Sequence, residues 1–162
     1  AALTFALVRD FTLSEALAAA KSILIRRPEH EETLNSLDLA ERLANSTTPP
    51  HEAIAQLGAG WVAEEALAIG LYCSLVADDF RKGVLLAVNH SGDSDSTGAI
   101  AGNLLGTMHG VDAIPSEWLQ RLELNDVIGE VADDLFEFPN WQIDDYSFDD
   151  VTQRICKKYP GF

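Results

Sequence analysis

Positively charged residues are scarce in this sequence. Its 162 residues include 11 Lys and Arg against 26 Asp and Glu, so the formal net charge is −15. Nucleic acids and anionic membranes attract basic surfaces, and this composition therefore argues against both as non-specific partners. A small phosphate-bearing ligand is still compatible with it, because a bound cation reverses the charge locally.

Cysteines and long apolar runs are also scarce. Cys73 and Cys156 match neither a disulfide framework nor a zinc-binding spacing, so we expect ordinary thiols of a reducing, cytoplasmic compartment, with Cys73 in the core. No apolar run reaches the length of a membrane span, and no signal-peptide pattern opens the chain. The first residue is Ala1 instead of Met, which leaves processing, truncation and an incomplete sequence as alternatives.

The alternation of apolar and polar residues that marks β-strands is missing as well. Apolar residues recur at helical spacing instead, and Thr12-Leu-Ser-Glu15 has the pattern of a helix-starting capping box. A hydrophobic content of 47% fits one globular domain with its own core. We therefore predict a single all-α domain over residues 1–162. The expected helices span residues 12–27, 29–45, 51–57, 62–76, 79–89, 96–110 and 124–136, with a short one around 118–119 and the end of another at residues 3–9. A second capping signature, Ser147-Phe-Asp-Asp150, opens a final helix that reaches about residue 158.

Two of these helices have distinctive apolar patterns. Residues 62–76 are apolar on nearly every side, which predicts a central, buried helix. Residues 124–136 are amphipathic, which predicts that one face of that helix is turned inward. The residues expected on this inner face are Val127, Ile128, Val131 and Leu135.

Glycines recur at every fourth position in the helix expected at residues 96–110. Gly98, Gly102, Gly106 and Gly110 therefore fall along one stripe of the helix. Each interior glycine costs about 1 kcal/mol relative to alanine, so the repeat needs a reason. We predict that a neighbouring backbone approaches this stripe closely; a loose, glycine-rich helix end is the alternative.

The most distinctive stretch is residues 89–98, Asn-His-Ser-Gly-Asp-Ser-Asp-Ser-Thr-Gly, which we call the acidic loop. It joins two expected helices and carries Asp93 and Asp95 together with several hydroxyl side chains. Two carboxylates held this close repel each other unless a proton or a cation lies between them. Hard cations such as Mg²⁺ bind carboxylate, hydroxyl and water oxygens, so the acidic loop predicts part of a metal site.

Two other chemistries share this local pattern. In a calcium loop of the EF-hand type, Asp93, Asp95 and Thr97 would take positions one, three and five. Position twelve of such a loop is Glu, whereas this sequence has Leu104. In a phosphatase of the haloacid dehalogenase type, Asp93 would be the nucleophile and Asp95 the acid/base. That motif follows a parallel strand, and a helix is expected here instead.

Residues 92–106 resemble the C-terminal motif of the ADP-ribosylglycohydrolase (dinitrogenase reductase-activating glycohydrolase-like) family, which is roughly G-D-x-D-T, small residues, then G-x-x-x-G. Residues 57–68 resemble the buried helix that precedes this motif in the family, and residues 110–115 resemble the segment that follows it. The three stretches come in the family's order, and the resemblance covers roughly residues 1–137. It implies an all-α orthogonal bundle, of which this chain would be the C-terminal half.

The resemblance also implies an activity and a cofactor. Members of the family are metal-dependent hydrolases that cleave the glycosidic bond between ADP-ribose and a protein side chain or related acceptor. By this resemblance, Asp93, Asp95 and Ser96 are ligands in a site for two Mg²⁺ or Mn²⁺ ions, with Ser96 where the family usually has Thr. The expected partner is an ADP-ribosylated protein or an ADP-ribose-type ligand.

Other polar and aromatic residues near the acidic loop are candidates for substrate contact. Trp61 fits a core position equally well, and Gly92 fits a role in loop geometry. His90 and His109 have positions that predict a helix C-cap and a helix end, respectively, rather than catalysis. The candidate substrate contacts are Gly60, Trp61, Ser91 and Gly92.

The family's remaining metal ligands come from an N-terminal T-D-D-like motif, and its substrate-facing acid comes from an early helix. Neither feature is present in these 162 residues, so the sequence assigns no catalytic acid. We expect a longer parent chain or a partner chain to supply the missing half. The alternative is a non-catalytic member of the same fold with a structural or interaction role.

Overall fold

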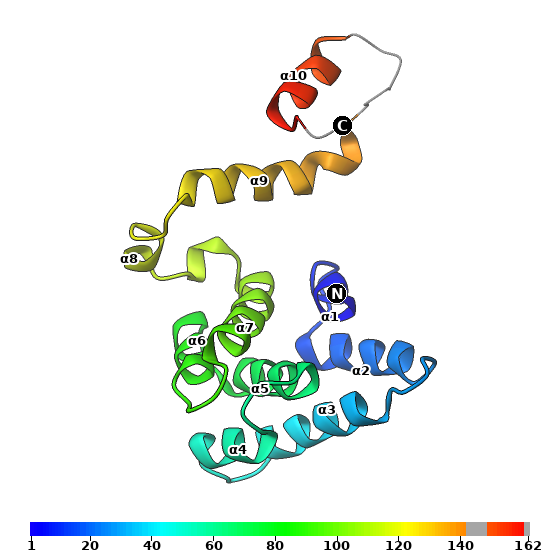
Figure 1. Ribbon diagram of the computed structural model, residues 1–162, viewed down its shortest axis with the longest axis vertical. Coiled ribbons are helices and arrows are strands. Elements are labelled where there is room, and N and C mark those ends of the chain that lie inside the picture. The colour runs from blue at the N-terminus through cyan, green and yellow to red at the C-terminus, as the bar shows by residue number, and fades with distance from the viewer. Residues whose placement is uncertain (142–148, 161–162) are drawn as a thin grey trace. The chain divides into compact units, whose positions relative to one another are not determined.

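A computed structural model describes residues 1–141 and 149–160, and Figure 1 shows its helices in order along the chain. Within these ranges the chain forms ten α-helices and no strand, which confirms the all-α prediction. No helix in these ranges is long and apolar enough to cross a membrane. The contacts gather into two compact units, Ala1–Ser116 and Glu117–Phe162.

The first unit carries the acidic loop. Its helices are α1 (Ala2–Leu7), α2 (Leu13–Leu24), α3 (Glu31–Ala44), α4 (Pro50–Leu57), α5 (Ala63–Val76), α6 (Phe80–Val88) and α7 (Ser94–His109), followed by the 3₁₀ turn η1 (Val111–Ala113). The predicted capping box is present, because Thr12 Oγ1 accepts from the Glu15 amide while Glu15 accepts from the Thr12 amide. α2 ends at Leu24, three residues before the predicted end.

Helix α5 is the centre of the first unit, as its apolar pattern predicts. It contacts α3, α4, α6 and α7, and Figure 1 shows it between α3 and α7. Its buried residues are Ala66, Ala68, Ile69, Gly70, Leu71, Tyr72, Cys73 and Ser74. Burial raises the pKa of the Cys73 thiol to about 12, whereas Cys156 is exposed.

The predicted backbone approach along the glycine stripe of α7 is wrong. A Cβ on Gly102 would meet nothing within 4 Å, and one on Gly106 would meet only the Phe80 side chain, at 3.8 Å. Gly98 is tightly packed, but its neighbour is the Val88 side chain instead of a backbone. Gly110 has a φ of +76° and ends the helix. The stripe therefore includes one tight side-chain contact and one helix terminus.

The close approach between α5 and α7 occurs at Gly70 instead. A Cβ on Gly70 would lie 2.6 Å from Ile100 Cγ2 and 3.2 Å from the Ala101 amide nitrogen. The small residue at this crossing thus belongs to α5, because α7 contributes Ile100 and its own backbone there. Sequence spacing reveals that glycines share a face, but it does not reveal which neighbouring helix lies against that face.

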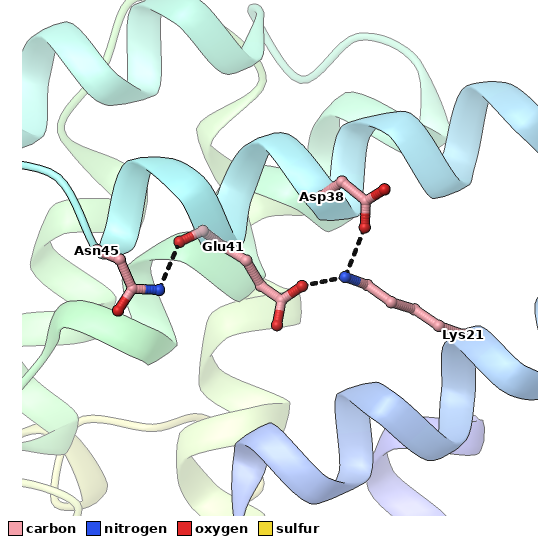
Figure 2. Close-up of polar contacts among 4 residues, drawn as sticks. All are labelled: Lys21, Asp38, Glu41 and Asn45. Carbon is pink, nitrogen blue, oxygen red and sulfur yellow. Dashed lines mark hydrogen bonds and ion pairs between the residues drawn. The ribbon is translucent and has the colours of Figure 1, made fainter.

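A partly buried group of one lysine and two acids connects α2 to α3. Lys21 extends from α2 to Asp38, at 2.6 Å, and to Glu41 on α3, as Figure 2 shows. Asn45 at the end of α3 donates a hydrogen bond to the Glu41 carbonyl oxygen at 2.8 Å. Partial burial disfavours the charge of Lys21, but its bonds to Asp38 and Glu41 outweigh this effect and raise the pKa of Lys21 above its ordinary value.

Replacing Lys21 with Met should destabilise the first unit by about 1 kcal/mol, because both carboxylate partners are partly exposed and screened by water. Folding raises the pKa of Lys21. The contribution of Lys21 to the free energy of unfolding is therefore complete below the unfolded-state pKa of 10.5 and is lost as the pH rises further. Urea unfolding at pH 7 and at increasing alkaline pH measures both effects. Lys82→Met, which removes an exposed pair with Asp78, is the control and should change stability less.

The second unit is built from α9 (Asn125–Glu137) and α10 (Asp150–Lys158), with the 3₁₀ turn η2 (Phe138–Asn140) after α9. The short α8 (Ser116–Leu119) begins at the last residue of the first unit, and the predicted start of the final helix, at residues 147–148, lies outside the described residues. Lys158 of α10 pairs with Glu130 at 2.6 Å and also with Asp134 on α9. The predicted inner face of α9 is wrong, since Val127 is 50% exposed and Leu135 is 70% exposed. Only Thr152 and Ile155 of α10 are buried, so α10 contributes too few side chains to cover this face of α9.

Candidate functional site

The acidic loop joins the end of α6 at Val88 to the start of α7 at Ser94. Asp93 is the N-cap residue of α7 and is half-buried, whereas Asp95 in the first turn is exposed and Ser96 is half-buried. The three predicted metal ligands therefore come from the N-cap and first turn of a single helix. Each of them has at least part of its surface open to solvent.

Asp93 and Asp95 are close enough to interact directly. A hydrogen bond shared with the Asp95 carboxyl, followed by hydrogen bonds from the side chain and amide of Ser96, lowers the pKa of Asp93 below its ordinary value. The loop therefore holds Asp93 as a carboxylate at neutral pH, beside a second acid and a hydroxyl.

His90 and Thr97 fix the conformation of the acidic loop. The Gly92 amide donates to His90 Nδ1 at 3.1 Å, which leaves Nε2 as the protonated nitrogen of a neutral ring. This Nε2 donates to Thr97 Oγ1 at 2.9 Å, and the Thr97 hydroxyl in turn donates to the Ala87 carbonyl oxygen at 2.7 Å. His90 thus connects the acidic loop to α7 through hydrogen bonds to Gly92 and Thr97.

The prediction that His90 caps α6 is wrong by one residue. Asn89 is the C-cap residue of α6, and its side-chain amide donates to the Leu85 carbonyl oxygen at 2.6 Å. His109 is the last residue of α7, as predicted. Sequence reasoning gave Thr97 a part only in the calcium-loop alternative and missed its structural role, although it is fully buried; the available signal was a second hydroxyl residue directly after Ser96.

A second loop, formed by Gly58-Ala59-Gly60 between α4 and α5, packs against the acidic loop. The Ala59 carbonyl oxygen accepts a hydrogen bond from the Asp93 amide at 2.8 Å. A Cβ on Gly92 would lie 1.7 Å from that same oxygen, so Gly92 serves loop geometry. Gly60 is buried with a φ of +80°, and a Cβ there would lie 3.0 Å from Thr97 Cγ2.

The two remaining candidate substrate contacts, Trp61 and Ser91, both lie at the protein surface. Trp61 is 72% exposed, so its alternative placement in the core is wrong. Ser91 is exposed and, with Gly92, lines an open pocket of about 550 Å³ beside the acidic loop. The same pocket is lined by His51, Ile54, Ala55, Gly58, Ala59, Asn89 and His90. Ser91 and Gly92 thus face a cavity, while Gly60 packs behind the loop.

The donor atoms of the acidic loop suit a hard divalent cation. Asp93 and Asp95 offer carboxylate oxygens and Ser96 offers a hydroxyl, which are the ligand types that Mg²⁺ and Mn²⁺ prefer. Over residues 1–141 and 149–160, no three His, Cys, Asp or Glu side chains are grouped so that they could hold a metal ion. Asp93, Asp95 and Ser96 therefore have donor atoms of the right type for a divalent cation, but they are too few to form a complete site.

The helical surroundings exclude the two alternative chemistries. Asp93 follows helix α6, whereas the haloacid dehalogenase motif requires a preceding strand. An EF-hand loop would continue through Leu104, but residues Ser94–His109 form the uninterrupted helix α7. Neither a phosphatase of that type nor a calcium loop is therefore compatible with this structure.

A sequence profile of the ADP-ribosylglycohydrolase family matches residues 1–143. The chain belongs to this family. The match includes the acidic loop, the Gly58-Ala59-Gly60 loop and the whole of the first unit. It confirms the family assignment that the three sequence motifs predict.

Individual relatives share shorter or weaker similarity with the chain. An ADP-ribosyl-[dinitrogen reductase] glycohydrolase of Rhodospirillum rubrum is 46% identical over 54 residues, which are 33% of this chain and 18% of the relative. The ADP-ribosylarginine hydrolase Tri1 of Pseudomonas putida is 28% identical over 125 residues, 75% of this chain and 34% of the relative. An uncharacterized protein of Archaeoglobus fulgidus is 31% identical over 134 residues, 80% of this chain and 41% of the relative.

The chain thus spans less than half the length of these three relatives. No solved structure matches it.

Proposed function

We propose that this chain forms the C-terminal part of a metal-dependent ADP-ribosylglycohydrolase active site. The observation that carries the proposal is the placement of Asp93, Asp95 and Ser96 on one helical turn, in a chain that belongs to this family. The proposed ligands are two Mg²⁺ or Mn²⁺ ions, and the proposed reaction releases ADP-ribose from a protein side chain or related acceptor. The relatives' names support this substrate class.

The chain's own residues have distinct parts in this proposal. Bound divalent cations would supply Lewis acidity and orientation of the ribose hydroxyls. Asp93 and Asp95 would hold these ions and add negative charge near the ribose, where positive charge develops as a glycosidic bond breaks. Ser91 and Gly92 line the adjoining pocket and would contact the substrate. The proton donor for the leaving group would come from outside residues 1–162.

The other half of the site is proposed to come from a longer parent chain or from a partner chain. Three oxygen-donor side chains fill only a few of the coordination positions of two cations and leave the rest to water. Metal binding by this chain alone should therefore be weak. Intact mass and the encoding reading frame test this part of the proposal. An acidic T-D-D-type motif upstream of Ala1 would support it, and a confirmed full-length chain that releases no ADP-ribose would favour the non-catalytic alternative.

Metal binding is tested by titrating Mn²⁺ into the chain by calorimetry. We expect saturable binding whose dissociation constant rises at least about tenfold in Asp93→Asn and in Asp95→Asn, because each change removes a charged ligand. Asp126→Asn is the matched control, since Asp126 lies in the first turn of α9 and should leave binding unchanged. Equal loss in all three variants, or no binding to the unaltered chain, would contradict the proposed site.

A further inference from the structure

Glu65 binds the loop that lies behind the acidic loop. It stands in the first turn of α5, and its Oε2 accepts hydrogen bonds from the Ala59 and Gly60 amides, both at 3.0 Å. Hydrogen bonds to an ionised acceptor are stronger than neutral ones. A Cβ on Gly58 would lie 2.3 Å from Glu65 Cδ, and Gly58 has a φ of +118°, so the loop needs glycine to wrap around this carboxylate.

The other side of the same loop contacts Asp93, one of the three predicted metal ligands. The Ala59 amide donates to Glu65, while the Ala59 carbonyl oxygen accepts from the Asp93 amide at 2.8 Å. A Cβ on Gly60 would lie 3.5 Å from the Asp93 carbonyl oxygen and 3.6 Å from its Cβ. The Gly58-Ala59-Gly60 loop therefore lies between Glu65 and Asp93 and is hydrogen-bonded to both.

We propose that Glu65 is a positioning residue for the metal site, acting on Asp93 through the Gly58-Ala59-Gly60 loop. Its effect on metal affinity rests on the function proposed above. Residues that orient metal ligands without touching the metal change affinity by about 10-fold to 100-fold when they are removed. Glu65 has this relation to Asp93, with one hydrogen-bonded loop between them.

A simpler role for Glu65 is the stabilisation of α5, because an acid in the first turn interacts favourably with the helix dipole. Glu64 lies beside it in the same turn and has the same charge. The dipole effect applies to both acids, whereas the bonds to Ala59 and Gly60 belong to Glu65. Glu64 is therefore the matched control for every experiment on Glu65.

The conservative substitution at this position is Glu65→Gln. Both loop amides donate to one oxygen of Glu65, and the side-chain oxygen of Gln can accept both bonds without the charge. Glu65→Ala removes the acceptor altogether. A positioning role therefore predicts that Gln largely preserves the arrangement of the acidic loop and that Ala does not.

Amide hydrogen exchange and Mn²⁺ titration of the complete chain test the proposal. In Glu65→Ala we expect exchange at Asp93 to be faster and Mn²⁺ affinity to be lower, each by about tenfold or more. Glu65→Gln should stay much closer to the unaltered chain in both measurements, and Glu64→Ala should change neither. Unchanged exchange at Asp93 in a folded Glu65→Ala, or equal effects in Glu64→Ala, would overturn the proposal.

Two outcomes separate this inference from the proposed function. If the unaltered chain binds no Mn²⁺, the proposed function fails, whereas exchange at Asp93 still decides whether Glu65 positions it. If Glu65→Ala does not fold, Glu65→Asp, whose shorter side chain withdraws the acceptor oxygen from the loop, is compared with Glu64→Asp. Faster exchange at Ala59, Gly60 and Asp93 in Glu65→Asp alone would support the proposal, and equal exchange in the two variants would overturn it.

Discussion

Replacing Gly92 with alanine should destabilise the first unit by about 3 kcal/mol, a large value for a single methyl group. The added Cβ would lie 1.7 Å from the Ala59 carbonyl oxygen and 2.6 Å from its carbonyl carbon. Both are backbone atoms, so the clash cannot be relieved by rotation of a flexible side chain. The two loops would have to separate, and the hydrogen bond from the Asp93 amide to Ala59 would be lost.

Urea unfolding followed by circular dichroism measures this effect, and Gly102→Ala is its matched control. Gly102 lies inside α7, where a new Cβ would meet nothing within 4 Å. That substitution should stabilise the chain by about 0.5–1 kcal/mol, because alanine favours the helix and restricts the unfolded chain. The two glycine substitutions thus have opposite expected signs. Equal stability of Gly92→Ala and the unaltered chain would show that the loops do not approach as described.

Mn²⁺ titration of Gly92→Ala adds a functional measurement. Separation of the loops would move Asp93, so the variant should bind Mn²⁺ more weakly than the unaltered chain. Gly102→Ala should bind it normally, since Gly102 lies two turns along α7 from the proposed ligands. A folded Gly92→Ala chain with normal Mn²⁺ affinity would contradict the idea that the position of Asp93 depends on this contact.

The helices could be predicted from the sequence because their signals are local. The capping box of Thr12 and Glu15, the apolar pattern of residues 62–76 and the loop at residues 89–93 each depend on neighbouring residues. The acidic loop was likewise recognisable as a candidate metal site, because two carboxylates and a hydroxyl occur within one short stretch. Local sequence is sufficient to identify a helix and a set of donor atoms.

The supports of the site could not be predicted, because they depend on contacts between distant segments. Glu65 acts on Asp93 through Ala59, and Gly92 meets a carbonyl more than thirty residues earlier in the chain. The same limitation explains the error at the glycine stripe of α7. Its spacing predicted a close approach, but the close approach to α7 is made by Gly70 of α5. Spacing places residues on a face without identifying the partner of that face.

Thr97→Val should destabilise the first unit by about 2 kcal/mol, although the two side chains have nearly the same shape. Thr97 is fully buried, and its hydroxyl donates to the Ala87 carbonyl oxygen at 2.7 Å while accepting from His90 Nε2 at 2.9 Å. Valine would leave the carbonyl group at the end of α6 and the imidazole N–H without this partner. Unsatisfied polar groups in a buried position are costly.

Thr107→Val is the matched control, since Thr107 lies in the same helix and donates only to Asn103 one turn earlier. Loss of this hydrogen bond should lower the free energy of unfolding by no more than about 0.5 kcal/mol. Thr97→Ser keeps the hydroxyl and should recover most of the lost polar interaction. If Thr97→Val and Thr107→Val unfold at the same urea concentration, the hydroxyl of Thr97 does not hold the acidic loop. If only Thr97→Val is destabilised and it also binds Mn²⁺ more weakly, the buried threonine and the two acids of the loop act as one structural unit.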